Sequence, residues 1–161
     1  MEYLKKIYSD RPELGNYKRL KDFAKKEVWE KLDQWCRNLL SKKQFHSSLA
    51  EIHEFNKEYD KVLAYVLSNP DRHWIYDKEK FADKLIPKYP KQLLPFYEVR
   101  VSQYIKMMER KNYKRAAGYA KKVKEICCKH LKQKVEWEKY INNIRRQYAN
   151  RPAMLDEFKG L

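Results

Sequence analysis

Apolar residues recur every three or four positions along most of this 161-residue chain, which is the spacing of one face of an α-helix. Between residues 17 and 41 the repeat consists of Tyr17, Leu20, Ala24, Val28, Leu32, Trp35 and Leu39. The charged triplet 25–27 interrupts the repeat and predicts a break between two helices. No segment shows the strict alternation that is typical of a half-buried β-strand.

Two shorter segments of the same kind follow, over residues 47–55 and 59–67. Ser47 or Ser48 suits the N-cap of the first segment, because a serine hydroxyl can accept a hydrogen bond from a free N–H group of the first turn. With Ser48 as the cap, Glu51 would complete a capping box. These features predict a second pair of helices.

Proline residues predict the next helix boundaries. Asn69-Pro70-Asp71 indicates a stop followed by a new cap, and the helix after it should end before Pro87. Its apolar positions are Trp74, Ile75, Phe81, Ala82 and Leu85. Pro90 suits the first position of the following helix, whereas Pro95 predicts a kink or a delayed start.

Two long helices are predicted in the C-terminal half. A short turn at 110–112 should precede a helix over 113–131, in which the small residues Ala116, Ala117, Gly118 and Ala120 allow close helix approach. The last long helix has the apolar positions Val135, Trp137, Tyr140, Ile141, Ile144 and Tyr148. Arg151-Pro152 should end it, and Met154, Leu155 and Phe158 predict a short terminal helix.

This pattern predicts an all-α fold of nine or ten helices. Because the connections are short, consecutive helices should be antiparallel neighbours, stacked as an irregular tetratricopeptide-like α-solenoid. Residues 112–148 most resemble one such repeat. We expect a single helical-repeat domain over 1–161, with sub-arrays 1–69 and 70–161 as a further division.

Charge is distributed unevenly along a chain whose net charge is +15. Residues 1–70 hold 14 basic and 11 acidic residues, residues 71–161 hold 23 and 11, and residues 100–151 hold 16 and 4. This excess indicates either a surface for nucleic acid or another polyanion, or well-solvated outer helix faces. The candidate polyanion-binding residues are Lys114, Lys121, Lys122, Lys129, Lys132, Lys134, Arg145 and Arg146.

Candidate chemistry is sparse. Cys36, Cys127 and Cys128 form no disulfide framework, so we expect free thiols in a reducing, cytoplasmic compartment. The run 128–130 is the nearest approach to metal-ligand spacing, and His53 with its acidic neighbours lacks the pattern of a di-iron site. Nucleotide, hydrolase and metalloprotease motifs are missing. We therefore expect no enzyme, no cofactor and no metal, and no apolar run approaches the ~20 residues of a membrane span.

Several segments resemble the C-terminal helical region of bacterial SWIM zinc-finger proteins. They include Arg11-Pro12-Glu13-Leu14, Tyr17-Lys18-Arg19-Leu20, Tyr59-Asp60-Lys61-Val62-Leu63 and the tail Arg151-Pro152-Ala153-Met154-Leu155-Asp156-Glu157-Phe158. The CxC…CxH zinc site that names the family has no counterpart in this sequence. The resemblance therefore implies a C-terminal fragment of a longer protein, or a stand-alone relative, and assigns no zinc or nucleic-acid role to any residue.

Two functions follow as hypotheses. The first is a non-enzymatic protein-interaction scaffold, in which stacked helix pairs form a groove for a segment of an unidentified protein partner. The alternative is a nucleic-acid-binding module that uses the basic face of residues 100–151. The distribution of the basic residues on the folded surface should discriminate between them, since a continuous stripe favours nucleic acid and an even scatter favours the scaffold.

Overall fold

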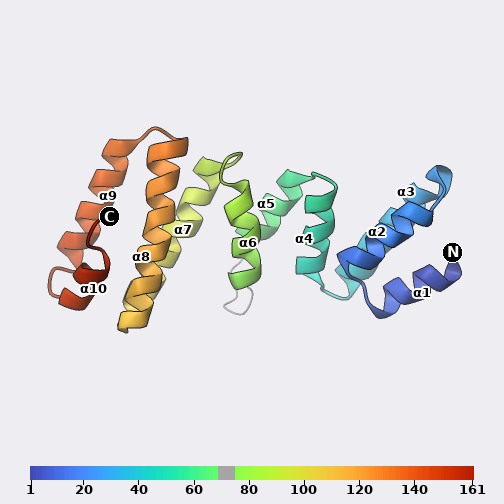
Figure 1. Cartoon of the computed structure of the whole chain (residues 1–161), viewed down its shortest axis with the longest axis horizontal. Coiled ribbons are helices and arrows are strands. Elements are labelled where there is room, and N and C mark those ends of the chain that lie inside the picture. Colours follow the sequence, from blue (N-terminus) through green and yellow to red (C-terminus); the bar gives the residue numbers. More distant parts are fainter. Residues whose placement is uncertain (69–74) are drawn as a thin grey trace. The chain divides into compact units, whose positions relative to one another are not determined.

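All regular elements in the described part of the chain are helical, which confirms the predicted fold class (Figure 1). The computed structural model describes residues 1–68 and 75–161, and for residues 75 and 76 it describes the backbone alone. The predicted stop at Asn69-Pro70-Asp71 and the apolar position Trp74 lie outside the described residues. The chain divides into two compact units, Met1–Phe81 and Ala82–Leu161, so the division falls within a helix.

The described residues of unit 1 form five helices and the beginning of a sixth. They are α1 (Glu2–Asp10), α2 (Leu14–Phe23), α3 (Lys26–Lys42), α4 (His46–Phe55), α5 (Tyr59–Leu67) and the first part of α6 (Ile75–Leu85). The break predicted near 25–27 is confirmed between α2 and α3. The N-terminal core consists of Tyr8, Tyr17, Leu20, Leu32, Cys36, Leu40 and Ile52.

The predicted serine cap of α4 is wrong. Phe45 occupies the N-cap position, no side chain caps the helix, and α4 begins at His46. The C-terminus of α3 fixes this entry point, because the Phe45 N–H donates to the Leu40 carbonyl at 2.9 Å while Gln44 takes a left-handed φ of 58°. Lys57, with φ 60°, closes α4 in the same way, so helix C-termini define the turns on both sides of α4.

Unit 2 contains the rest of α6, then α7 (Pro90–Lys106), α8 (Arg110–Glu125), the π-helix η2 (Ile126–His130), α9 (Lys134–Gln147) and α10 (Pro152–Glu157). Pro90 is the first residue of α7 as predicted, but the helix continues through Pro95, so the expected delayed start is wrong. The missing Pro95 N–H frees only the carbonyl of Lys91, which is solvent-exposed. The predicted turn at 110–112 is also wrong, because residues 107–109 make the turn and α8 begins at Arg110.

The antiparallel pair α7 and α8 forms the centre of unit 2 (Figure 1). Ala116, Ala117 and Ala120 are buried, as expected of residues that allow close helix approach. The π-helix that follows α8 was not predicted, and the Leu131 N–H donates to the Ile126 carbonyl five residues earlier. Val135 was predicted to face the core, and this prediction is wrong, because Val135 is 60% exposed near the start of α9.

Candidate functional site

The structure does not gather the eight candidate polyanion-binding residues on one element. Four of them are engaged within unit 2. Lys122 pairs with Asp83 at 3.3 Å, Lys129 with Glu125 at 3.7 Å and Lys134 with Glu138 at 3.8 Å, and Arg145 donates to the carbonyls of Phe158 and Leu161 at 3.5 and 3.3 Å. The three ion pairs partly offset the charges of their lysines, and Arg145 uses a donor group on backbone carbonyls.

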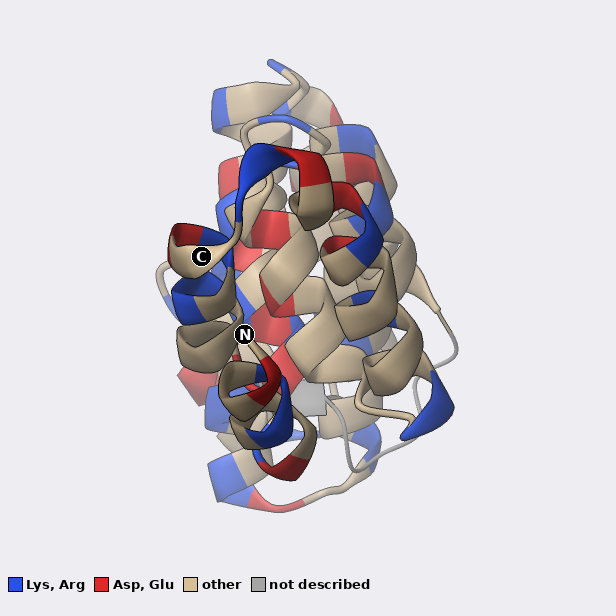
Figure 2. Cartoon of the chain, turned by 90° about the vertical axis from the view of Figure 1, so that its right-hand side faces the viewer, with Lys and Arg blue, Asp and Glu red and all other residues tan. Residues whose placement is uncertain are grey.

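The other four residues are exposed and have no ion pair among the described residues. Lys114 and Lys121 lie on α8, Lys132 lies in the loop before α9, and Arg146 lies on α9. Figure 2 shows basic and acidic positions interspersed along the helices. The charge therefore does not form one continuous stripe over residues 100–151, although α8 retains a local basic face.

A groove of about 520 Å³ lies in unit 2, where side chains of α7 are joined by Tyr140 of α9. Its lining residues are Glu98, Val99, Ser102, Gln103, Lys106 and Tyr140. The Val99 side chain is 49% exposed, so apolar surface is available there. The groove thus combines an apolar side chain with hydrogen-bonding groups, which is the composition expected of a recognition surface.

Two polar groups of this groove lack a hydrogen bond or an ion pair among the described residues. The Tyr140 hydroxyl is buried and has no hydrogen-bond partner among the described residues. Glu98 has no ion pair among them, and burial raises the pKa of its carboxyl. A buried polar group without a partner costs about 1–3 kcal/mol, so the Tyr140 hydroxyl lowers the stability of unit 2.

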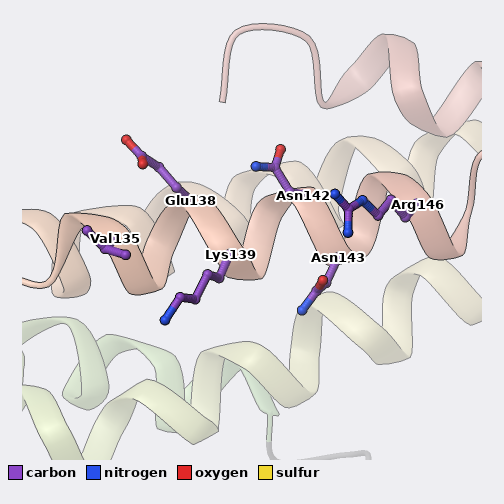
Figure 3. Close-up of a pocket in the computed structure, with 6 residues that line it drawn as sticks. All are labelled: Val135, Glu138, Lys139, Asn142, Asn143 and Arg146. Carbon is purple, nitrogen blue, oxygen red and sulfur yellow. The ribbon is translucent and has the colours of Figure 1, made fainter.

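A second surface hollow, of about 490 Å³, involves α9 alone (Figure 3). It is lined by Val135, Glu138, Lys139, Asn142, Asn143 and Arg146, which all project from one helix. No second element provides an opposite wall among these residues. This hollow therefore provides a control position, Val135, for experiments on the groove of α7.

Unit 1 contains a polar network that the sequence analysis missed. Arg37 on α3 donates to Asp33 at 2.9 Å and to Glu58 at 2.7 Å. Glu58 also accepts a hydrogen bond from His53 and pairs with Lys61 at 3.3 Å. The Asp33–Arg37 and Glu58–Lys61 pairs were predictable, since their members lie four and three positions apart in the sequence. The Arg37–Glu58 contact was not, since 21 positions separate its members.

The remaining members of the network join it to the core of unit 1. The Tyr17 hydroxyl donates to Asp33 at 2.6 Å, and the Asn56 amide donates to that hydroxyl at 2.8 Å. Arg37 and His53 together lower the pKa of Glu58 to about 2, against the opposing effect of burial. Burial lowers the pKa of His53. Because its polar groups satisfy one another, the network is a structural element that connects α2, α3, α4 and the start of α5.

The three cysteines are free, and none of the described residues form a His, Cys, Asp and Glu group that could hold a metal ion. Burial raises the pKa of Cys36 to about 12 and that of Cys127 to about 11. Both thiols are therefore poor nucleophiles at neutral pH.

Comparison with known proteins gives one informative relative. The chain is 31% identical over 108 residues to the uncharacterized protein YwqB of Bacillus subtilis (strain 168). The match covers 54% of this chain and 20% of YwqB, so the chain spans about a fifth of that relative. No protein-family model and no solved structure matches the chain. None of the described helices combines the length and apolar character that a membrane span requires.

Proposed function

We propose that the chain is a non-enzymatic, cytoplasmic interaction scaffold that binds a segment of a partner protein. Its antiparallel helix pairs would form an irregular tetratricopeptide-like α-solenoid. The groove between α7 and Tyr140 is the observation that carries this proposal. A scaffold of this kind needs an accessible surface that its own core does not use, and the groove provides one.

The composition of the groove favours a polypeptide ligand. Ser102 and Gln103 can exchange hydrogen bonds with a peptide backbone, and Val99 offers apolar contact. A partner segment could also contact the half-buried Glu98. The scattered positions of the basic residues support the scaffold over a nucleic-acid-binding face that extends across residues 100–151.

We propose further that this scaffold corresponds to the C-terminal helical region of SWIM zinc-finger proteins, as the sequence resemblance implies. The much greater length of YwqB supports a comparison with part of a longer protein. In that setting the helical part would recruit a partner while another part carries a separate activity.

Site-specific photo-crosslinking tests the groove. p-Benzoylphenylalanine at position 99 samples the groove, and the same residue at position 135 samples the exposed face of α9, where a valine of similar exposure stands. We expect a discrete adduct in cells from position 99 and none from position 135. The segment identified by mass spectrometry should then bind the purified chain in calorimetry.

Two substitutions serve as matched variants in that binding assay. Val99→Glu should weaken binding of the identified segment at least tenfold, because it places a carboxylate on the apolar part of the groove. Val135→Glu makes the same chemical change on α9 and should leave affinity within twofold. Equal affinities for the two variants, or adducts of equal yield at the two positions, would contradict the proposal.

A further inference from the structure

Gly118 lies in the interior of α8 on its exposed side, and nothing in the fold explains it. A Cβ atom added at this position would meet no described heavy atom within 4 Å, and the backbone there is not left-handed. Glycine in a helix interior costs about 0.5–1 kcal/mol relative to alanine. Neither packing nor backbone conformation therefore requires a glycine here, and the position leaves an open patch of helix surface on α8.

Four basic residues surround Gly118 on the helix surface. Lys114 and Arg115 precede it by four and three positions, and Lys121 and Lys122 follow it by three and four. Residues with these spacings are direct neighbours of the central position. We call the five residues 114, 115, 118, 121 and 122 the Gly118 face.

The members of this face differ in how firmly they are held. Lys122 lies 3.3 Å from Asp83, and the Arg115 guanidinium lies 5.8 Å from the centre of the Tyr104 ring. Lys114 and Lys121 are exposed and have no ion pair among the described residues. The last two therefore keep their full charge for a ligand.

We propose that the Gly118 face binds the phosphodiester backbone of a nucleic acid, with one phosphate seated against the bare helix backbone at Gly118. A phosphate has several oxygens that accept hydrogen bonds and can engage more than one lysine and the fork of an arginine. Lys114 and Lys121 are separated by about 10 Å along the helix, since each residue rises 1.5 Å. Along the axis of a duplex, that distance corresponds to about three phosphate-to-phosphate steps of one strand.

An acidic protein segment is a less suitable ligand for this face. Protein interfaces usually depend on buried aromatic or aliphatic anchors, and the Gly118 face contains only charged side chains and a glycine. Contacts to phosphate alone confer no base preference, so binding should be independent of sequence. The face lies on α8 and uses none of the residues that line the groove, so it goes beyond the scaffold function.

Fluorescence anisotropy of the full chain tests the proposal. The probes are a fluorescein-labelled 20-nucleotide oligothymidylate and a 20-base-pair duplex, at 0.15 M NaCl. Lys114→Glu with Lys121→Glu should weaken binding of at least one probe tenfold or more. Lys91→Glu with Lys159→Glu changes the net charge equally at two exposed positions elsewhere in unit 2 and should weaken it less than threefold. Lys122 is left unchanged because a glutamate there would face Asp83.

A substitution of Gly118 tests the proposal without changing the net charge. Gly118→Leu adds a side chain that blocks close approach and should weaken binding at least fivefold while raising the melting temperature. Asn142→Leu, on the exposed face of α9, should leave binding within twofold. Equal losses for the two charge-reversal pairs, unchanged binding by Gly118→Leu, or displacement of the probe by polyglutamate as effective as by unlabelled oligonucleotide would each overturn the proposal.

Discussion

Replacing Arg37 with methionine should destabilise unit 1 because Arg37 is the cation that joins two carboxylates of the polar network. Its guanidinium contacts Asp33 and Glu58 from α3. Methionine keeps the volume of the side-chain stem but removes the charge and every donor. Asp33 would then retain the Tyr17 hydroxyl as a donor, and Glu58 would retain His53 and Lys61.

The size of the effect follows from the burial of the two carboxylates. Removing one partner of a fully buried ion pair costs about 3–5 kcal/mol. The side chains of Asp33 and Glu58 keep 24% and 29% exposure, so water and their remaining donors compensate in part. We therefore expect Arg37→Met to lower the free energy of unfolding by about 2–3 kcal/mol at pH 7.

Urea titrations followed by circular dichroism measure this change. A double-mutant cycle with Glu58→Gln should give a coupling free energy of about 1–2 kcal/mol between Arg37 and Glu58. The loss in free energy of unfolding caused by Arg37→Met should also depend on pH. The Glu58 carboxylate, whose pKa is lowered to about 2, stabilises the fold above about pH 4.5 and loses this effect as the pH falls toward 2.

Arg37→Met already removes much of the stabilisation by the Glu58 carboxylate. The free energies of unfolding of the wild type and the variant should therefore converge as the pH falls over this range. A coupling free energy below 0.5 kcal/mol, or a deficit that stays constant between pH 5 and 2.5, would refute the assignment of Arg37 as the centre of the network. Arg37→Lys is the informative control, because it restores the charge without the planar fork and should recover only part of the lost stability.

Three further predictions concern packing, turn geometry and thiol chemistry. Ala120→Leu should overpack the contact of α8 with α7 and lower stability by about 1–3 kcal/mol in thermal or urea unfolding, whereas an unchanged midpoint would place this face outside the core. Lys57→Gly should raise stability by about 0.5–1 kcal/mol because glycine adopts the left-handed φ of 60° without strain, while the same change at Lys61, inside α5, should lower it. Cys36 and Cys127 should resist iodoacetamide at pH 8 in the native protein and react after unfolding, and rapid native alkylation of either thiol would contradict their burial.

The sequence predicted the helices well because their apolar stripes are local. The segment 59–67 and Pro90 at a helix start agree with the structure. Arg151-Pro152 does not end the last long helix as predicted, because α9 ends at Gln147 and Pro152 begins α10. Helix ends were less predictable where the neighbouring turn determines them. The serine cap failed because the α3 C-terminus, with Gln44 in a left-handed conformation, fixes the start of α4, and no glycine marks that turn.

Long-range partners could not be predicted from one sequence. A stripe indicates which face of a helix is buried but not which element covers it, so the Arg37–Glu58 contact and the Lys122–Asp83 pair carried no local signal. The positions of Lys114 and Lys121 opposite the alanine stripe were predictable, because helical periodicity alone determines them. Gly118 was expected to allow close helix approach, and this prediction is wrong, because Gly118 is exposed and its surroundings in the folded chain are open.

The π-helix over 126–130 has a consequence for how this chain can change in length. A π-turn holds one more residue per turn than the α-helix around it, so deleting one residue there would return the segment to α-helical hydrogen bonding. The loop at 131–133 follows at once and can absorb the resulting rotation before α9 begins. Homologous chains should therefore tolerate single-residue gaps at this point while keeping Trp137 and Ile141 in the core.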